Sequence, residues 1–145
     1  MSQLKHFIEN NQKERERLFA LVDGLKEADF ARKLPNGWTV GVALAHLAFW
    51  DLSQVTRLKA WLEKGTKPPS LDADAVNEAL AILSASLPPK EVVKLVHQAA
   101  EAIDGMIEKL TPTQSGELLG MGLERNLHRA LHRQAHLPKI EKALQ

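Results

Sequence analysis

The sequence predicts an all-α fold, a four-helix bundle with a crossover connection that carries a short extra helix. Leu and Ala together number 41, whereas Val, Ile and Thr together number 18 and Tyr is absent. Small and unbranched side chains lose little freedom in a helix, and the β-branched and aromatic residues that favour strands are scarce. Proline and glycine residues divide the chain into segments of helical length.

The first two long helices are separated by a turn. A helix that Ser2 caps is expected to run to about Val22, where Asp23-Gly24 ends or bends it. Leu34–Gly37 reads LPNG, which predicts a break because Pro lacks a backbone donor and Asn-Gly favours turns. A second helix is expected from Thr39 to Lys64, ending at a glycine.

Two proline pairs, Pro68-Pro69 and Pro88-Pro89, delimit the connection between the second and third long helices. An apolar helical period between them predicts a short helix, capped by Asp72 or Asp74 and ending near Ser86. A connection of this length is too long for a tight hairpin. It therefore predicts a crossover in place of a simple up-down-up-down order.

The rest of the chain predicts one long helix, a loop and a final helix. Pro89 suits the first turn of a helix that runs to about Leu110. The segment Thr113–Gly122 contains three Gly residues and is expected to be a loop. The last helix is expected to span Leu123–Leu144, with a bend at Pro138.

Composition limits the class of protein. Residues 1–145 suit a single domain with one hydrophobic core, and 19 basic residues nearly balance 18 acidic ones. This balance argues against a nucleic-acid partner, and the absence of Cys excludes thiolate metal sites and cysteine nucleophiles. No apolar run is long enough to span a membrane, and Met1–Asn10 lacks the pattern of a signal peptide. We therefore expect a soluble, cytoplasmic protein with no membrane partner.

His46 is the first candidate for chemistry. It lies in the stretch Gly41–Trp50, which is apolar on every side of a helix, so its imidazole is expected to be buried. A buried imidazole must have a partner. That partner is either a metal ion or, if His46 is an ordinary core residue, a backbone carbonyl or Asp51.

A column of histidines on the last helix is the second candidate. His128, His132 and His136 recur every fourth residue, and two His residues at this spacing can bind one metal ion. A third ligand from a neighbouring helix would complete the site, and His46 is the available one. Arg residues flank the column, so a solvated basic face or a phosphate-binding face is the alternative. Apolar residues in the final turns favour an inward position for His132 and His136 over His128.

These segments resemble the DinB-like superfamily. Asn36–Val40 reads NGWTV, Leu44–Asp51 reads LAHLAFWD, and His132–Ile140 reads HRQAHLPKI, similar to the ending of the family's last helix. Members are metal-binding four-helix proteins that include mycothiol-dependent maleylpyruvate isomerases and bacillithiol transferases. The resemblance covers most of the chain, and Pro138 departs from the family pattern.

The resemblance implies that His46, His132 and His136 bind one divalent metal ion, with Zn or Ni as the expected ion. It also implies a low-molecular-weight thiol as cosubstrate, which must come from outside because the chain has no Cys. Arg125 and Arg129 are the candidates for binding anionic groups of the thiol or its acceptor.

Two functions from different classes follow. The first is a metal-dependent enzyme that activates a small thiol or water and acts on a small-molecule substrate as a thiol transferase or thiol-dependent isomerase. The alternative is a non-catalytic, stress-related bundle that binds a metal or another ligand as a homodimer. A concave pocket at the metal would favour the enzyme, and a filled site would favour the alternative.

The three Trp residues carry separate expectations. Trp38 is expected to be largely buried and to close the N-terminal end of the second helix, with its indole N–H donating to a turn carbonyl. Trp50 is expected to fill the core. Trp61 is the stronger candidate for an interface in the homodimer that we expect.

Overall fold

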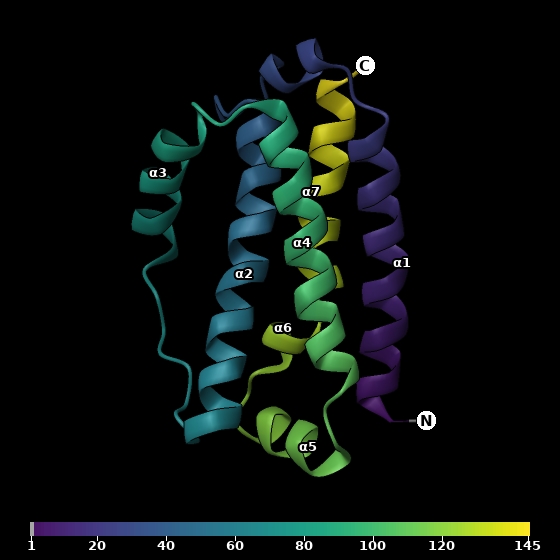
Figure 1. Cartoon of the computed structure of the whole chain (residues 1–145), viewed down its shortest axis with the longest axis vertical. Coiled ribbons are helices and arrows are strands. Elements are labelled where there is room, and N and C mark those ends of the chain that lie inside the picture. The colour runs from purple at the N-terminus through teal and green to yellow at the C-terminus, as the bar shows by residue number, and fades with distance from the viewer. Residues whose placement is uncertain (1) are drawn as a thin grey trace.

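A computed structural model describes residues 2–145, and within this range the chain forms seven α-helices, one short 3-10 helix and no β-strand. The all-α prediction is confirmed. Four long helices form the bundle: α1 (Gln3–Asp23), α2 (Val40–Lys64), α4 (Pro89–Glu108) and α7 (Ala130–Ala143) (Figure 1). No helix within residues 2–145 is long and apolar enough to cross a membrane.

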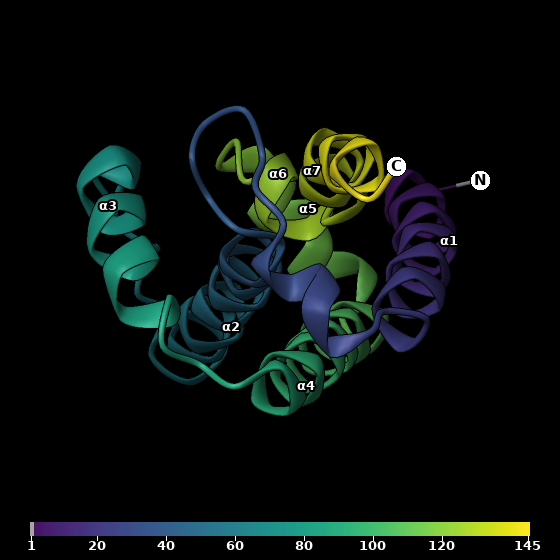
Figure 2. The same cartoon turned by 90° about the horizontal axis from the view of Figure 1, so that it is seen from above.

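The crossover is also confirmed. In Figure 1, α1 and α7 run upward, whereas α2 and α4 both run downward. The chain must therefore return to the top between α2 and α4, and it does so through an extended segment and α3 (Ala73–Ser84). Viewed from above, α2 and α1 lie on a diagonal, and each packs against both α4 and α7 (Figure 2).

The predicted helix ends follow ordinary capping chemistry. The Ser2 side chain accepts a hydrogen bond from a backbone N–H of the first turn of α1, and Thr39 and Asp72 do the same for α2 and α3. Gly65 ends α2 with a φ of 67°, a left-handed conformation that glycine adopts without steric cost.

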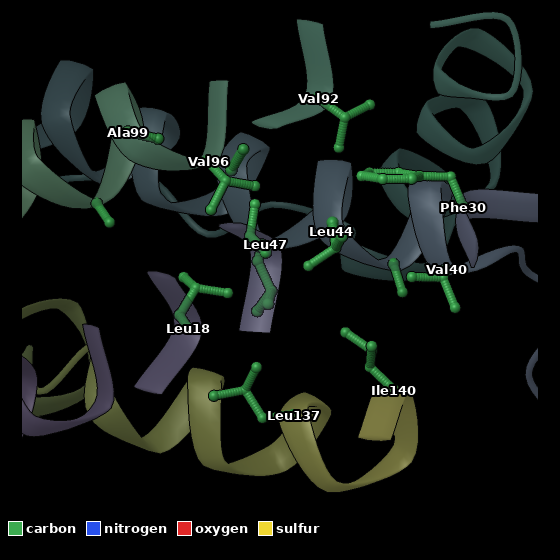
Figure 3. Packing of buried hydrophobic residues seen from close by; sticks show 14 of the residues in the cluster. Leu18, Phe30, Val40, Leu44, Leu47, Val92, Val96, Ala99, Leu137 and Ile140 are labelled. Atoms are coloured by element: carbon green, nitrogen blue, oxygen red, sulfur yellow. The ribbon is translucent and has the colours of Figure 1, made fainter. Parts of the chain in front are cut away.

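Two apolar clusters fill the bundle. The upper cluster joins α2, α4 and α7 through side chains that include Leu44, Val96 and Leu137 (Figure 3). The lower cluster includes Trp61 and Ile103 and is closed from below by Leu118. The upper cluster holds the N-terminal part of α2 against α7, which is where the candidate ligands lie.

The loop prediction for Thr113–Gly122 is wrong, because most of this segment is helix α5 (Pro112–Gly120). Thr111 accepts a hydrogen bond from the Gln114 N–H, and the Gln114 side chain accepts one from the Thr111 N–H. This reciprocal capping starts the helix, and Pro112 suits its first turn. Burial of Leu118 against the lower cluster outweighs the cost of glycine in a helix.

The prediction of one continuous last helix is also wrong. The segment forms a single turn, α6 (Glu124–Leu127), and then α7, with a break where His128 adopts a ψ of 73°. The Asn11 side chain on α1 satisfies both broken ends: it donates to the Leu127 carbonyl (2.9 Å) and accepts from the Ala130 N–H (2.8 Å). A capping residue more than a hundred positions away left no signal in the local sequence.

Candidate metal centre

His46 lies in the most deeply packed part of α2. Every residue from Val40 to Ala48 is buried, because this part of α2 contacts the 3-10 helix η1 (Glu27–Ala31) as well as α4 and α7. His46 itself is 4% exposed. The predicted burial of its imidazole is therefore confirmed.

The turn before α2 positions Trp38 against this histidine. The Leu34 N–H donates to the Trp38 carbonyl, and the Trp38 N–H donates to the Asn36 side chain. Gly37 completes the turn with a φ of 89°. The Trp38 ring lies 5.0 Å from the His46 ring and packs against the upper cluster. Most of its surface is buried, as expected, and the part that stays exposed forms one wall of a cavity beside His46.

Two turns of α7 bring His132 and His136 to His46. The His46 ring centre lies 4.9 Å from that of His132 and 4.6 Å from that of His136, and the two α7 rings are 4.8 Å apart. One nitrogen of each ring lies within 4.8 Å of the others, and the Nε2 atoms of His46 and His132 are 2.9 Å apart. The predicted convergence of the three side chains is confirmed.

The donor set fits a divalent metal ion. Neighbouring ligand atoms of a tetrahedral zinc site lie about 3.3 Å apart, and the ligand atoms of this triad all lie within 4.8 Å of one another, with one pair at 2.9 Å. Each neutral imidazole carries a lone pair on one ring nitrogen. Three imidazoles that face one another cannot all share one hydrogen bond, whereas one cation can accept a lone pair from each. The His₃ site can therefore hold a divalent metal.

Burial keeps the three imidazoles neutral. It lowers the pKa of His46 to about 4, with repulsion from His136 as the second cause and the Asn77 side chain in opposition. It lowers the pKa of His132 to about 2, with the positive charge of Arg129 as the second cause. The pKa of His136 is lowered by burial and then by Lys139. Neutral imidazole is the form that binds metal, so the ligands are ready at neutral pH.

A chain of ion pairs lies behind the triad. Arg133, with no exposed surface, donates two hydrogen bonds to the Asp104 carboxylate (2.9 and 3.0 Å) and one to Asp51 (3.2 Å). Asp51 also accepts from Nε of Arg129 (2.9 Å), and Asp104 accepts from Arg15 (2.7 Å). These five residues, Arg15, Asp104, Arg133, Asp51 and Arg129, are called the ionic chain below.

The ionic chain corrects two sequence interpretations. Asp51 bonds to arginines, so it is not the core partner of His46. The interpretation of the last helix as a solvated basic face also fails, because Arg129 and Arg133 are buried while Leu131 is 39% exposed. The break after α6 rotates α7 relative to a continuous helix. An Asp amid apolar residues in the third long helix, at Asp104, was the one signal that could have indicated a buried charge.

His128 lies apart from the triad, as expected. It is buried at the helix break and stacks on Phe7 at 4.4 Å, and its Nε2 atom is 3.2 Å from the Asn10 amide nitrogen. Burial and then His6 lower its pKa. His128 therefore borders the site from the α1 side without joining the metal ligands.

Two cavities open beside the triad, with volumes of about 400 and 500 Å³. Trp50, Arg125 and His132 line both, so the two cavities are adjacent, and together they are called the cleft below. The expectations for the tryptophans on α2 are reversed. Trp50 is half-buried in the cleft wall, with its indole N–H donating to Asn77 of α3 (2.8 Å), whereas Trp61 is buried in the lower cluster.

The fold and site define a helical-bundle protein with three histidines placed to hold one divalent metal at the floor of an open cleft. A family model described as the DinB superfamily matches residues 11–136, a range that contains His46 and both α7 ligands. The chain belongs to the DinB superfamily. No curated protein and no solved structure gives a significant match.

Proposed function

We propose that this protein is a metal-dependent enzyme in which His46, His132 and His136 hold Zn²⁺ or Ni²⁺ and the adjoining cleft receives a small-molecule substrate. The observation that carries the proposal is the cleft itself. A purely structural metal is enclosed by its ligands, whereas a catalytic one keeps an open position. Here the triad borders two cavities of about 400 and 500 Å³.

The chemistry that fits is transfer to or from a small thiol, with water as the other candidate nucleophile. When bound, the metal supplies a Lewis acid that lowers the pKa of the nucleophile. The thiol comes from a cosubstrate because the chain has no Cys. The thiol proton passes to solvent, the sulfur bonds to an electrophilic carbon, and the leaving group departs with its electron pair. We place this activity in the cytoplasm, where small thiols are kept reduced.

The residues of this chain orient the reactants. The Trp50 indole is held by Asn77 and presents a flat apolar wall to both halves of the cleft. The Trp38 ring packs beside His46 and forms part of the wall of the second cavity. The triad imidazoles stay neutral and so do not compete for the proton that the nucleophile loses.

The test begins with elemental analysis of protein purified without a polyhistidine tag. We expect about one Zn or Ni per chain, and a His46→Ala variant with less than a tenth of it. The exposed His6 provides the matched control, because His6→Ala should keep the metal. Thiol consumption is then followed with free cysteine and 1-chloro-2,4-dinitrobenzene. No metal in the wild type, or equal rates for the wild type and His46→Ala, contradicts the proposal.

A homodimer is the partner proposal that accompanies this function. Its support is the outer face of α3, where Ile82 is 76% and Leu83 is 73% exposed. Adjacent exposed apolar residues on a helix mark interaction surfaces. Light scattering of the wild type and of an Ile82→Lys, Leu83→Lys double variant tests it. We expect the wild type to be a dimer and the double variant to be a monomer. A monomeric wild type would exclude the dimer, and it would also exclude the alternative function as a non-catalytic dimer.

A further inference from the structure

Positive charge is concentrated around the cleft, although the chain as a whole is nearly neutral. The formal net charge is +1, from 19 basic and 18 acidic residues. The two cavities beside the triad are lined by Arg125, Arg129 and Lys139 and by no carboxylate. A third cavity of about 590 Å³ shares Lys139 with the second one and adds Lys33 and Lys142, again without an acidic residue.

Among these cations, Arg129 has the side chain whose position is most firmly fixed. Its side chain is 6% exposed, and its Nε donates to Asp51 while Nη1 donates to the Arg125 carbonyl. Nη2 donates no hydrogen bond within residues 2–145, and Arg129 lines the first cavity. Two fixed contacts thus hold the guanidinium in place, and its remaining amino group is available to a ligand.

The carboxylates behind the cleft do not neutralise it. The ionic chain contains three guanidinium groups and two carboxylates, and Asp51 is shared between Arg129 and Arg133. Arg57 lies close enough to Arg129 that repulsion, after burial, lowers the Arg57 pKa. The nearby carboxylate of Glu124 is exposed on α6, so solvent screens its charge, and it faces His128, whose pKa it raises slightly against the effect of burial. A surplus of positive charge in a partly buried cleft favours an anionic ligand.

We propose that the cleft binds an oxyanion, a carboxylate or phosphate group, on Arg129 and Arg125, so that the substrate or cosubstrate is an elongated acid with its reactive group at the histidine triad. The Trp50 wall is common to both halves of the cleft and lies between the two ends of this ligand. The inference rests on the proposed function for the role of the triad. The oxyanion subsite itself needs no metal.

The experiment uses metal-free, full-length protein, so that the probe cannot bind to a metal ion. Inorganic phosphate in one arm and succinate in the other are titrated while the indole N–H signals of Trp50 and Trp61 are followed by NMR. We expect saturable shifts at Trp50 and none at Trp61, which is buried in the lower cluster. Saturation by phosphate, by succinate or by both supports the subsite, and the preferred probe identifies the oxyanion.

Three variants locate the binding. Arg129→Gln is expected to raise the dissociation constant at least about tenfold, as for a hydrogen bond to a charged group. Arg125 is exposed, so Arg125→Gln should raise it about threefold and should fold normally even if Arg129→Gln does not. Lys94→Gln on α4 removes the same charge from an exposed residue that lines neither cavity, and it should change the dissociation constant less than twofold.

Two results overturn the subsite: no saturable shift with either probe, or equal affinities for Arg125→Gln and Lys94→Gln. The failure of the metal proposal is separate. If the protein binds phosphate or succinate but never holds a metal, the oxyanion subsite is supported and only the proposed metal-dependent activity is contradicted.

Discussion

The triad and the ionic chain both include polar side chains of α7, and they differ in charge. In the ionic chain, Arg133 donates to two carboxylates and to the Asn11 carbonyl (3.0 Å), and its buried Nε has no partner within residues 2–145. In the triad, three neutral imidazoles converge, and the Nε2 atoms of His46 and His132 lie 2.9 Å apart. The guanidinium groups are already paired with opposite charges, whereas the imidazole lone pairs are open to a cation, so the two groups serve different purposes.

This difference assigns stabilisation to the ionic chain and ligand binding to the triad. A network of ion pairs holds helices in register, and removing one partner leaves a buried charge. A set of neutral donor nitrogens gains a charged partner only when a cation arrives. The ionic chain thus fixes α7 against α1, α2 and α4, so that His132 and His136 face His46. The following predictions test this division, in order of decreasing expected effect.

Removal of Asp104 should have the largest effect on stability. Asp104→Ala leaves the buried Arg133 without its two-bond partner and should lower the free energy of unfolding by about 3–5 kcal/mol in urea denaturation. The matched control is Asp23→Ala. Asp23 pairs with His97 at the surface, and its loss should cost less than about 1 kcal/mol. Equal losses for the two variants would show that the ionic chain is not the stabilising group.

Metal should stabilise the folded protein through the triad alone. Zinc at 100 times its dissociation constant should raise the free energy of unfolding by about 2.7 kcal/mol relative to protein in EDTA. His132→Ala should abolish this gain, whereas His128→Ala should retain it because His128 lies outside the triad. A full gain in His132→Ala contradicts the assignment of the ligands.

The pH dependence should reflect the neutral imidazoles. The folded-state pKa of His46 is about 4, below its unfolded value of 6.5, so the unfolded chain binds more protons between these values. Stability is then full above pH 6.5 and falls towards pH 4, by at most about 1.4 kcal/mol per pH unit from this histidine. Denaturation from pH 7 to 4.5 should show a smaller slope for His46→Leu than for the wild type.

The same lowered pKa values carry a consequence for metal affinity. Zinc binding should persist well below pH 6.5, because no triad ligand has to lose a proton until the pH approaches the lowered values. A loss of zinc affinity centred at pH 6.5 would contradict this prediction.

The smallest effect is expected at the contact between the crossover helix and the cleft. Asn77→Ala removes the acceptor of the Trp50 indole N–H and should cost about 0.5–1.5 kcal/mol, as for one neutral hydrogen bond. Metal content should not change, because Asn77 is not a ligand. The indole N–H signal of Trp50 should move to a solvent-exposed position in the NMR spectrum. An unchanged signal would show that the contact does not hold α3 in solution.

Much of this architecture could be predicted from local sequence. The helix ends at Ser2, Thr39 and Gly65 follow from the short-range preferences of single residues. The burial of His46 follows from its apolar neighbours. The triad could be predicted because the i, i+4 pair on the last helix and the segment around His46 resembled a known family.

The sequence by itself determined that this chain is helical and where most helices begin and end, because these depend on neighbours within about one turn. It also nominated the three histidines as ligand candidates, because His132 and His136 are one turn apart and the family resemblance added His46. Only the tertiary structure decided the helix break at His128, the inward position of Arg133 and the exchange of roles between Trp50 and Trp61. Each depends on a partner distant in the sequence: Asn11 for the break, Asp104 for the arginine and Asn77 for the indole. A buried polar group takes the environment that satisfies its hydrogen bonds, and the packing of distant segments sets that environment.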